Sequence, residues 1–454
     1  MTNPRITVVD RSRLRYIVDR SAHFRRRDFQ GFPKPTPPPV YVIEDMLAQR
    51  PFPLPVLVGV VQAPFFTPSG RLVLAPGYDG ETKRYLQLPD DLRALNVPSQ
   101  PTAGELHRSL AVIEDLLCDF PFVSDADGAN AIAKLLDPFT RTIHDSVTPL
   151  YVFTAPTPGT GKGLLADVLT IPATGGRVMR TPFIKGEAEL AKRLFALLLE
   201  GTEHVHFDNL EGSLNSTTLS SFLTSEVYSD RVLGKSTMPS FPQRINMSLS
   251  GNNVIFGGDI PRRVALIQLD ARVEKPQARG GFKHDDICEW ALQNRAVIVQ
   301  ACLIIVQTWV NAGMKPGSVS LGSFEKWART SSGILEHAGI PGFLENRKEV
   351  EELADVEGDA WLQWVLAWWE TFRNRVVKPV DLIELVDLVD YPPFYVTDDG
   401  TAKSMSIKIG KALMTKKDRI FGGFAVRLSR VDKATGSKLW KLERVSEDAE
   451  EDPD

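Results

Sequence analysis

The segment 156–163, with the sequence PTPGTGKG, has the residue types and spacing of a loop that binds phosphate. An apolar run at 150–153 precedes it, and a helix-like run at 164–169 follows it. The order strand, glycine-rich turn, lysine, helix is that of a phosphate-binding loop. A plain Gly/Pro turn is the alternative. The candidate ligand-binding residues are Pro158, Gly159, Thr160, Gly161, Lys162, Gly163 and Leu164.

The chemistry expected of this loop is the binding of ATP together with Mg²⁺. Small residues let backbone N–H groups surround a phosphate chain, and the helix N-terminus adds partial positive charge. Lys162 would reach the outer phosphates. Two positions depart from the usual motif. Pro156 stands where the first glycine is usual, and Gly163 stands where a Ser or Thr hydroxyl normally meets Mg²⁺.

Polar residues follow two later apolar runs. Asp208 ends the run 203–208, about 45 residues after the loop, where a Walker-B acid would hold Mg²⁺. Asn252 and Asn253 follow the run 245–250, and either amide would position the attacking water. An arginine from a neighbouring subunit would stabilise transition-state charge, an effect of ~10³–10⁵ in rate. The candidates for that role are Arg231, Arg262 and Arg263.

The region 146–272 alternates strand-like and helix-like segments, including a strong helical pattern at 187–199. This alternation predicts an α/β fold, with a parallel sheet and helices on both faces. Ligands lie beyond the carboxyl ends of the strands in such sheets. Gly159, Asp208 and Asn252 all fall at such ends, so the sequence places them at one site.

Composition bounds the class of protein. A chain of 454 residues with 43% hydrophobic and 24% charged residues is typical of globular proteins with about two to four domains. The net charge of −4 does not indicate a strongly basic nucleic-acid binder, although it is compatible with local basic patches. No signal peptide or membrane-spanning run is visible, and the three scattered cysteines fit a reducing cytoplasm.

The chain divides into regions of different composition. Arginines crowd the first 39 residues, before a Pro-rich stretch expected to be a stiff linker. This arm would bind nucleic acid, or else form a solvated helix or pack on a neighbouring subunit. The predicted regions are a basic arm and linker (1–39), a β-rich and helical region (40–145), a P-loop ATPase core (146–285), a helical segment (286–376), a winged-helix domain (377–445) and an acidic tail (446–454).

The region 377–445 predicts helices followed by a basic β-hairpin, the order of a winged helix whose second helix would enter a DNA groove. A protein-interaction domain is the alternative. Its candidate DNA-binding residues are Lys408, Lys411, Lys416 and Lys417. Tryptophans at 361, 364, 368 and 369 have helical spacing and are expected to be core.

From 151 to 270 the chain resembles the AAA+-like ATPase of phage, plasmid and genomic-island primase-helicase proteins, close to superfamily 3 helicases. The motifs that carry the resemblance are APTPGTGKGLL (155–165), HFDNLEG (206–212), LTSEVYSDRVLGKS (223–236), LSGNNVIFGGDIPRRV (249–264) and SFEKWARTSSGILEHAGIPGFL (323–344). The segments 56–79 and 404–442 are also similar to the flanking parts of such proteins. No primase catalytic region is visible, so a separate primase would be a further partner.

The resemblance implies a role for each matching residue. Lys162 would be the Walker-A lysine, Asp208 the Walker-B acid, and Asn252 or Asn253 the first sensor. Arg262 or Arg263 would be the finger acting across a subunit boundary, in a ring that is a hexamer. Lys235 would face DNA in the channel of that ring, and Arg329 would be a second sensor.

One further departure concerns hydrolysis. The family usually places Glu after the Walker-B Asp, but here Asn209 follows Asp208. Glu211 would act as the base, or Asp208 would serve both roles. The leading hypothesis is an ATP-dependent DNA helicase or replication-initiator ATPase of a mobile genetic element. The alternatives are a nucleotide-gated DNA loader or scaffold with little hydrolysis, and a AAA+ protein remodeller.

Overall fold

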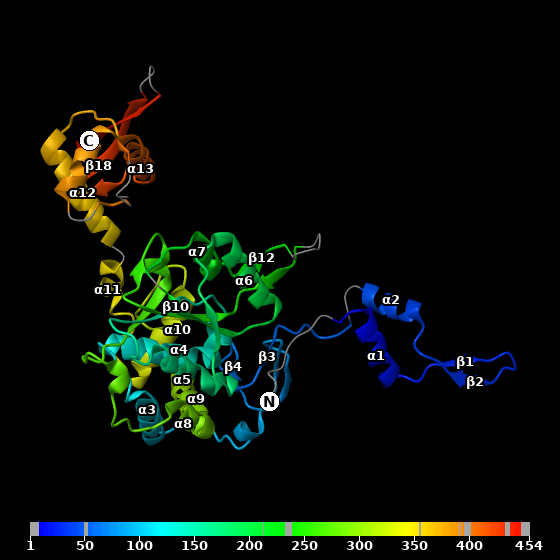
Figure 1. The fold of residues 1–454 in the computed structure, drawn as a ribbon. Helices are drawn as coiled ribbons and strands as arrows, with labels where there is room; N and C mark the ends of the chain where they lie inside the picture. The colour runs from blue at the N-terminus through cyan, green and yellow to red at the C-terminus, as the bar shows by residue number, and fades with distance from the viewer. Residues whose placement is uncertain are drawn as a thin grey trace, which may run out of the picture. The chain divides into compact units, whose positions relative to one another are not determined.

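The computed structural model describes residues 9–49, 53–210, 212–231, 238–353, 356–389, 392–394, 401–431 and 436–445. The chain forms two compact units (Figure 1). The first takes in the described residues up to Gly212, Ser216–Asn253 and Arg262–Asn346. The second takes in Ser213–Asn215, Val254–Pro261 and the described residues from Arg347 onward.

A five-stranded parallel sheet forms the centre of the first unit. Its order is β16-β8-β14-β10-β9, and every neighbouring pair is parallel. Every residue of β8 is buried, as a parallel strand covered on both faces requires. The predicted α/β fold with a parallel sheet is therefore confirmed. The strands are β8 (Leu150–Ala155), β9 (Met179–Pro182), β10 (His204–Leu210), β14 (Asn246–Asn252) and β16 (Val264–Gln268).

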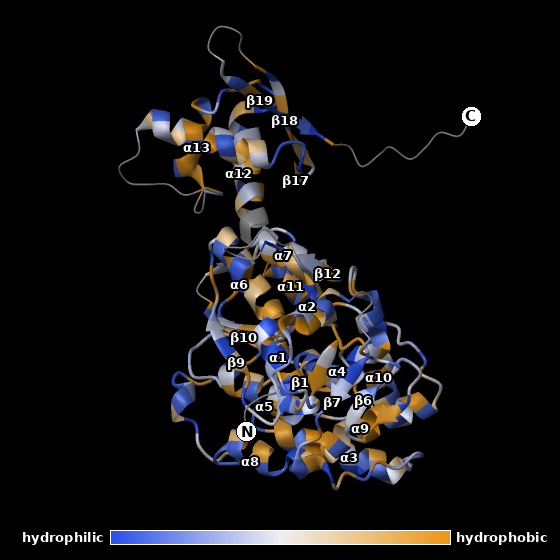
Figure 2. Cartoon of the chain, turned by 90° about the vertical axis from the view of Figure 1, so that its right-hand side faces the viewer, coloured by the Kyte–Doolittle hydropathy of each residue, from blue (hydrophilic) through white to orange (hydrophobic). Residues whose placement is uncertain are grey.

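Helices flank this sheet. The connecting helices are α5 (Lys162–Thr174), α6 (Glu187–Leu199) and α7 (Thr217–Thr224). The others are α3 (Ala103–Leu117), α4 (Asp125–His144), α8 (Ile287–Gln293), α9 (Arg295–Asn311) and α10 (Glu325–Ala338). Within the predicted helical segment 286–376, the first apolar stretch is divided at Asn294, which ends α8 and precedes α9. Much of α9 is hydrophobic (Figure 2) and buried, so it belongs to the core.

Short strands precede the sheet, as the β-rich prediction for this region expected. They are β3 (Gly59–Val61), β4 (Phe65–Phe66), β5 (Leu72–Val73), β6 (Gly77–Asp79) and β7 (Arg84–Leu86), followed by the 3₁₀ turn η1 (Asp90–Leu92). The segment before them consists of α1 (Arg11–Ser21), β1 (Arg25–Arg27), β2 (Pro33–Pro35) and α2 (Val40–Ala48). Leu14, Val18 and Ile43 join its helices. Part of the expected linker is thus a strand, because β2 pairs with β1.

Further small elements belong to one or the other unit. Those of the first unit are β12 (Val227–Ser229), β13 (Ser240–Pro242) and η3 (Pro276–Ala278). Those of the second are β11 (Ser213–Leu214), β15 (Ile255–Phe256) and α11 (Arg347–Glu352), and η2 (Ile260–Arg263) has residues in both. β12 and β13 form an antiparallel hairpin.

The second unit has a core of tryptophans. Trp361, Trp364 and Trp368 of α12 are buried together with Trp440, as the helical spacing predicted. The unit consists of α12 (Val356–Phe372), η4 (Asp381–Leu388), α13 (Ala402–Thr415), β17 (Ile420–Phe421), β18 (Phe424–Val431) and β19 (Lys438–Arg444). Its boundary differs from the expected 377, because the tryptophan face of α12 packs against α13 and the hairpin. The acidic tail 446–454 lies outside the described residues.

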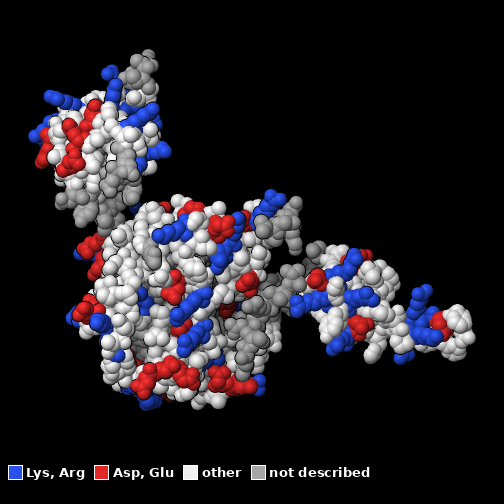
Figure 3. Space-filling model, viewed as in Figure 1, with Lys and Arg blue, Asp and Glu red and all other residues white. Residues whose placement is uncertain are grey.

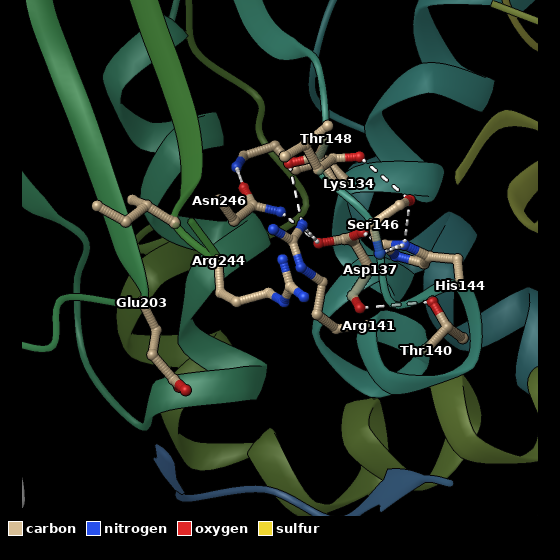
Figure 4. A network of polar contacts seen from close by, with 12 residues as sticks. Lys134, Asp137, Thr140, Arg141, His144, Ser146, Thr148, Glu203, Arg244 and Asn246 are labelled. Carbon is tan, nitrogen blue, oxygen red and sulfur yellow. Dashed lines mark hydrogen bonds and ion pairs between the residues drawn. The ribbon is translucent and has the colours of Figure 1, made fainter. Parts of the chain in front are cut away.

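A buried polar network lies at the amino ends of the central strands (Figure 4). Asp137 of α4 accepts hydrogen bonds from Arg141 Nη1 at 3.3 Å, His144 Nε2 at 3.1 Å and Asn246 Nδ2 at 2.8 Å. Lys134 donates to the Oδ1 atom of Asn246. Because Asn246 begins β14, this network attaches α4 to the sheet.

Among the described residues, no single helix is both long enough and apolar enough to cross a membrane. Only α8 and α9 together reach that composition, and they are bent by 75° at their junction.

Candidate nucleotide-binding site

A pocket of about 430 Å³ lies at the carboxyl ends of β8, β14 and β10. This is the edge of the sheet where the sequence placed the site. Most of the residues predicted to bind phosphate line it, as do Asp208 and Asn252. Its lining residues are Pro158, Gly159, Thr160, Gly161, Lys162, Gly163, Leu164, Arg177, Arg180, Asp208, Asn209, Ser250, Gly251 and Asn252.

The loop between β8 and α5 has the backbone of a phosphate cradle. Gly159 and Gly161 have φ angles of 77° and 99°, a region that L side chains rarely adopt. Thr160 Oγ1 donates to the carbonyl of Thr157 at 2.7 Å, which fixes the turn. Gly161 is the N-cap of α5 and makes no side-chain cap. The first N–H groups of α5 therefore remain available to an anion.

The side chain of Lys162 contacts β14, the neighbour of the strand β8 that leads into the loop. Its Nζ donates to Asn252 Oδ1 at 2.7 Å and lies 3.5 Å from the Thr157 carbonyl. This contact follows from register, because Asn252 of β14 pairs with Ala155 of β8. Burial lowers the pKa of Lys162, and the charge of Asp208 opposes that shift. Asn253 is exposed instead, and its side chain is 3.4 Å from the Pro156 carbonyl.

Asp208 lies at the end of β10, where its side chain is 42% exposed. It accepts a hydrogen bond from Ser250 Oγ at 2.6 Å, and the guanidinium of Arg180 is 3.8 Å away. Burial raises the pKa of Asp208, but Ser250 and the positive surroundings outweigh it and hold the pKa below its usual value. Asp208 is therefore an ionised carboxylate that faces the pocket.

Among the described residues that line this pocket, Asp208 is the only carboxylate available to Mg²⁺. No group of three or more His, Cys, Asp or Glu that could hold a metal occurs among the described residues. Mg²⁺ often takes one or two carboxylates, with phosphate oxygens and water as its other ligands. Asp208 fits that pattern only if phosphates and water supply the rest, since Gly163 contributes no hydroxyl.

Asn209 occupies a bulge in β10. Its φ is 57°, and the pairing with β14 is interrupted between Phe207 and Leu210. Asn tolerates this left-handed conformation better than most residues. The backbone thus accounts for Asn where the resembling family has Glu. Glu211, the alternative base, lies outside the described residues.

A second pocket, of about 300 Å³, lies on the other side of the loop. It shares Gly159, Thr160, Gly161, Leu164 and Arg177 with the first. Its further lining is partly apolar and comes from distant segments: Asp119, Phe120, Pro276, Arg279, Phe282, His284, Asp285, Asp286 and Ile287. The sequence analysis missed these residues, because nothing in their spacing links 119–120 to 276–287.

Sequence reasoning also missed Arg180 of β9. Nothing in the spacing of the sequence places Arg180 beside the loop. In the structure its Nη2 donates to Asp167 Oδ2 at 2.6 Å and to the Gly163 carbonyl at 3.1 Å. Arg180 thus connects β9 to the first turns of α5.

Several predicted residues are not brought to either pocket. Among the described residues that line them, Arg231, Arg262, Arg263 and Arg329 do not occur. Arg262 and Arg263 precede β16 and so lie at the amino edge of the sheet. Arg329 is exposed on α10, and Arg231 is exposed next to the β12–β13 hairpin. Lys235 falls outside the described residues.

The predicted DNA-binding lysines belong to the second unit. Lys411 and Lys417 are exposed, and Lys408 and Lys416 are partly buried. Lys408 and Lys411 belong to α13, whose buried residues are Met405, Ile409 and Leu413, and Lys416 is the C-cap of that helix. Lys and Arg side chains show on the surface of this unit (Figure 3).

No family model matches the sequence, and no curated protein matches it significantly. Solved structures do resemble it. The A form apo structure of the NrS-1 C-terminal region has a TM-score of 0.41 and 11% identity, covering 89% of each chain. SCCmec type IV Cch, titled an active helicase, has a TM-score of 0.33 and 13% identity, covering 89% of this chain and 82% of its own.

JCV helicase has a TM-score of 0.24 and 12% identity, covering 55% of this chain and 73% of its own. These likenesses are too distant to support a function, so the interpretation rests on the geometry of the two pockets.

Proposed function

We propose that the first unit binds ATP at the loop 156–163. The observation that carries this proposal is the contact of Lys162 with Asn252, beside the Ser250–Asp208 pair, at the N-terminus of α5. The phosphates would occupy the pocket that contains Lys162 and Asp208. The base and sugar would occupy the partly apolar pocket beyond Gly161, lined by Phe120 and Phe282.

The chain's own residues would divide the chemistry between them. Loop N–H groups and Lys162 bind and orient the phosphates. Asp208, with Ser250 fixing one of its oxygens, is the protein ligand for Mg²⁺, which when bound neutralises charge developing on the phosphates. Asn252 holds Lys162 and is placed to orient a water. Glu211, or Asp208 itself, would accept that water's proton.

The further proposal is that hydrolysis drives a DNA helicase or replication-initiator ATPase of a mobile genetic element. The position of Arg262 and Arg263 supports an assembly, because they lie at the sheet edge opposite to their own pocket. They would act only on a neighbouring subunit's nucleotide, in a ring of six. The order α12, η4, α13 and then a β-hairpin supports a winged helix that binds DNA.

The test measures phosphate release and strand displacement by the full chain with DNA, ATP and Mg²⁺. We expect both activities in the wild type and neither in Lys162→Ala. Lys192→Ala, which removes an exposed lysine of α6 that pairs with Glu189, is the matched control and should behave as wild type. Phosphate release no greater than that of Lys162→Ala would contradict hydrolysis.

A second candidate is a nucleotide-gated DNA loader or scaffold with little turnover. Two observations favour it: Gly163 offers no hydroxyl, and Asn209 stands in a backbone conformation unsuited to Glu. ATP-dependent DNA binding without strand displacement would establish this candidate in place of the first. Nucleotide binding with no DNA binding at all would favour a remodeller of proteins.

A further inference from the structure

Arg180 lies at the part of the loop where phosphate-binding loops usually carry a hydroxyl. Its guanidinium donates to the Gly163 carbonyl at 3.1 Å, and its Nη1 is 3.8 Å from Asp208 Oδ2. A Cβ atom added to Gly163 would stand 3.2 Å from Nη1 and 3.3 Å from Nη2 of Arg180. A serine or threonine at 163 would therefore compete with the guanidinium for space. The absence of a hydroxyl at position 163 therefore leaves room for the guanidinium of Arg180.

Asp167 holds the guanidinium in this place. This carboxylate is one turn further along α5, is fully buried, and accepts from Arg180 Nη2 at 2.6 Å. It also accepts from the Val178 N–H at 3.2 Å, which ties it to the segment leading into β9. The guanidinium is thus positioned before any ligand arrives, which reduces the entropy lost on binding.

Arg180 is not fully used by these contacts. Its side chain is 40% exposed, and it lines the pocket that contains Lys162, Asp208 and Asn252. An arginine presents five N–H donors in a planar fork that matches phosphate oxygens. Arg180 therefore joins Lys162 and Arg177 as a cationic residue lining the same cavity, whose described lining contains one carboxylate, Asp208.

We propose that Arg180 is a phosphate ligand that takes over the link between loop and phosphates usually made through a hydroxyl and Mg²⁺. A nucleoside triphosphate then binds the loop through Lys162, Arg180 and the backbone, with an affinity that depends little on divalent metal. Mg²⁺, held by Asp208, matters for hydrolysis more than for binding. This inference rests on the proposed nucleotide site and specifies how that site binds phosphate.

The test is equilibrium binding of a fluorescent ATP analogue to the full chain, with Mg²⁺ and with a chelator. We expect the wild type to bind with similar affinity in both conditions. Arg180→Ala should lose about 10- to 100-fold in chelator, the range that hydrogen bonds to charged groups give. The loss should persist with Mg²⁺, because Gly163 offers the ion no hydroxyl in place of the arginine. Arg108→Ala, an exposed arginine of α3, is the matched control.

A second variant separates phosphate binding from a purely structural role. Arg180→Ala with Gly163→Ser makes room for a hydroxyl, so its affinity should recover with Mg²⁺ and remain weak in chelator. Circular dichroism verifies that both variants are folded. Wild-type binding that disappears in chelator, or Arg180→Ala binding as tightly as the wild type, would overturn the inference while leaving the nucleotide site intact. Wild-type binding no tighter than that of Lys162→Ala would instead overturn the site itself.

Discussion

At the amino ends of the central strands, Asp137 accepts three hydrogen bonds and is 2% exposed. At the carboxyl ends, Asp208 accepts one side-chain hydrogen bond, from Ser250, and is 42% exposed. Both carboxylates have an arginine nearby, Arg141 and Arg180, and the pKa of each is below its usual value. The carboxylate of Asp137 is fully paired within the fold, whereas that of Asp208 is partly exposed and lines a cavity.

The difference shows how one sheet separates stability from function. A charge that is buried and fully paired cannot be altered without loss of stability. A charge that is positioned but only partly paired can exchange its partners for a ligand. The carboxyl ends of the central strands therefore have the properties of a binding site, and the polar network at their amino ends stabilises the fold.

The largest expected difference between Asp137 and Asp208 is in their contributions to the free energy of unfolding. Asp137→Ala leaves Arg141 and His144 buried without their acceptor, and we expect the free energy of unfolding to fall by about 3–5 kcal/mol. Asp208→Ala removes a half-exposed charge and should change it by about 1 kcal/mol or less. Urea unfolding measures both. Equal midpoints for Asp137→Ala and the wild type would contradict the structural role.

His206 provides a pH test at the centre of the sheet. It is fully buried between Ser248 and Ser250, and burial lowers its pKa to about 4, against the pull of Asp208. Between pH 6.5 and 4 the unfolded chain binds a proton that the folded chain does not. Stability therefore falls as pH falls, by up to ~1.4 kcal/mol per pH unit, and the loss ends below the folded pKa.

His206→Asn should remove this slope from urea unfolding measured across that pH range. The buried His144, whose pKa is also lowered, contributes equally in both proteins and cancels from the difference. The carboxylates Asp137 and Asp208, whose folded pKa values are lowered, add their own slope only near and below the pKa of an unfolded Asp, about 3.9. Parallel stability curves for wild type and variant would show that His206 is not buried in the neutral form.

The smallest expected effect is a difference in ATP affinity between variants of the neighbouring residues Asn252 and Asn253. Asn252→Ala removes the acceptor of Lys162 and should weaken ATP binding about tenfold. Asn253→Gly, which keeps the positive φ of that position, should change it by less than about twofold. Titration with the fluorescent analogue measures both variants. The reverse order would assign the sensor role to Asn253.

Much of the fold could be predicted because its signals are local. The apolar run that became β8 leads into the loop 156–163, and those that became β10 and β14 lead to Asp208 and Asn252. Strand order then brings Asp208 and Asn252 to Lys162, since parallel strands share a carboxyl edge. The helical spacing of Trp361, Trp364 and Trp368 likewise predicted a core position.

The rest depends on contacts between distant segments, which spacing does not encode. Nothing local indicates that Arg180 reaches across to Gly163, or that Phe120 and Phe282 line one pocket. Asn252 rather than Asn253 contacts Lys162 because Asn252 pairs with Ala155. The positive φ of Asn209 belongs to a bulge in β10. The second unit begins before residue 377 because α12 packs against α13 and the β-hairpin. These are features of tertiary packing.

The central claim is that the loop 156–163 holds a nucleoside triphosphate through Lys162. The most direct measurement is the binding isotherm of ATP for the wild type and for Lys162→Ala, with unfolding curves to show that both are equally folded. We expect saturable ATP binding by the wild type. The affinity of Lys162→Ala should be at least about tenfold lower, because a charged phosphate contact is removed. Equal affinities, or no binding by a folded wild type, would contradict it.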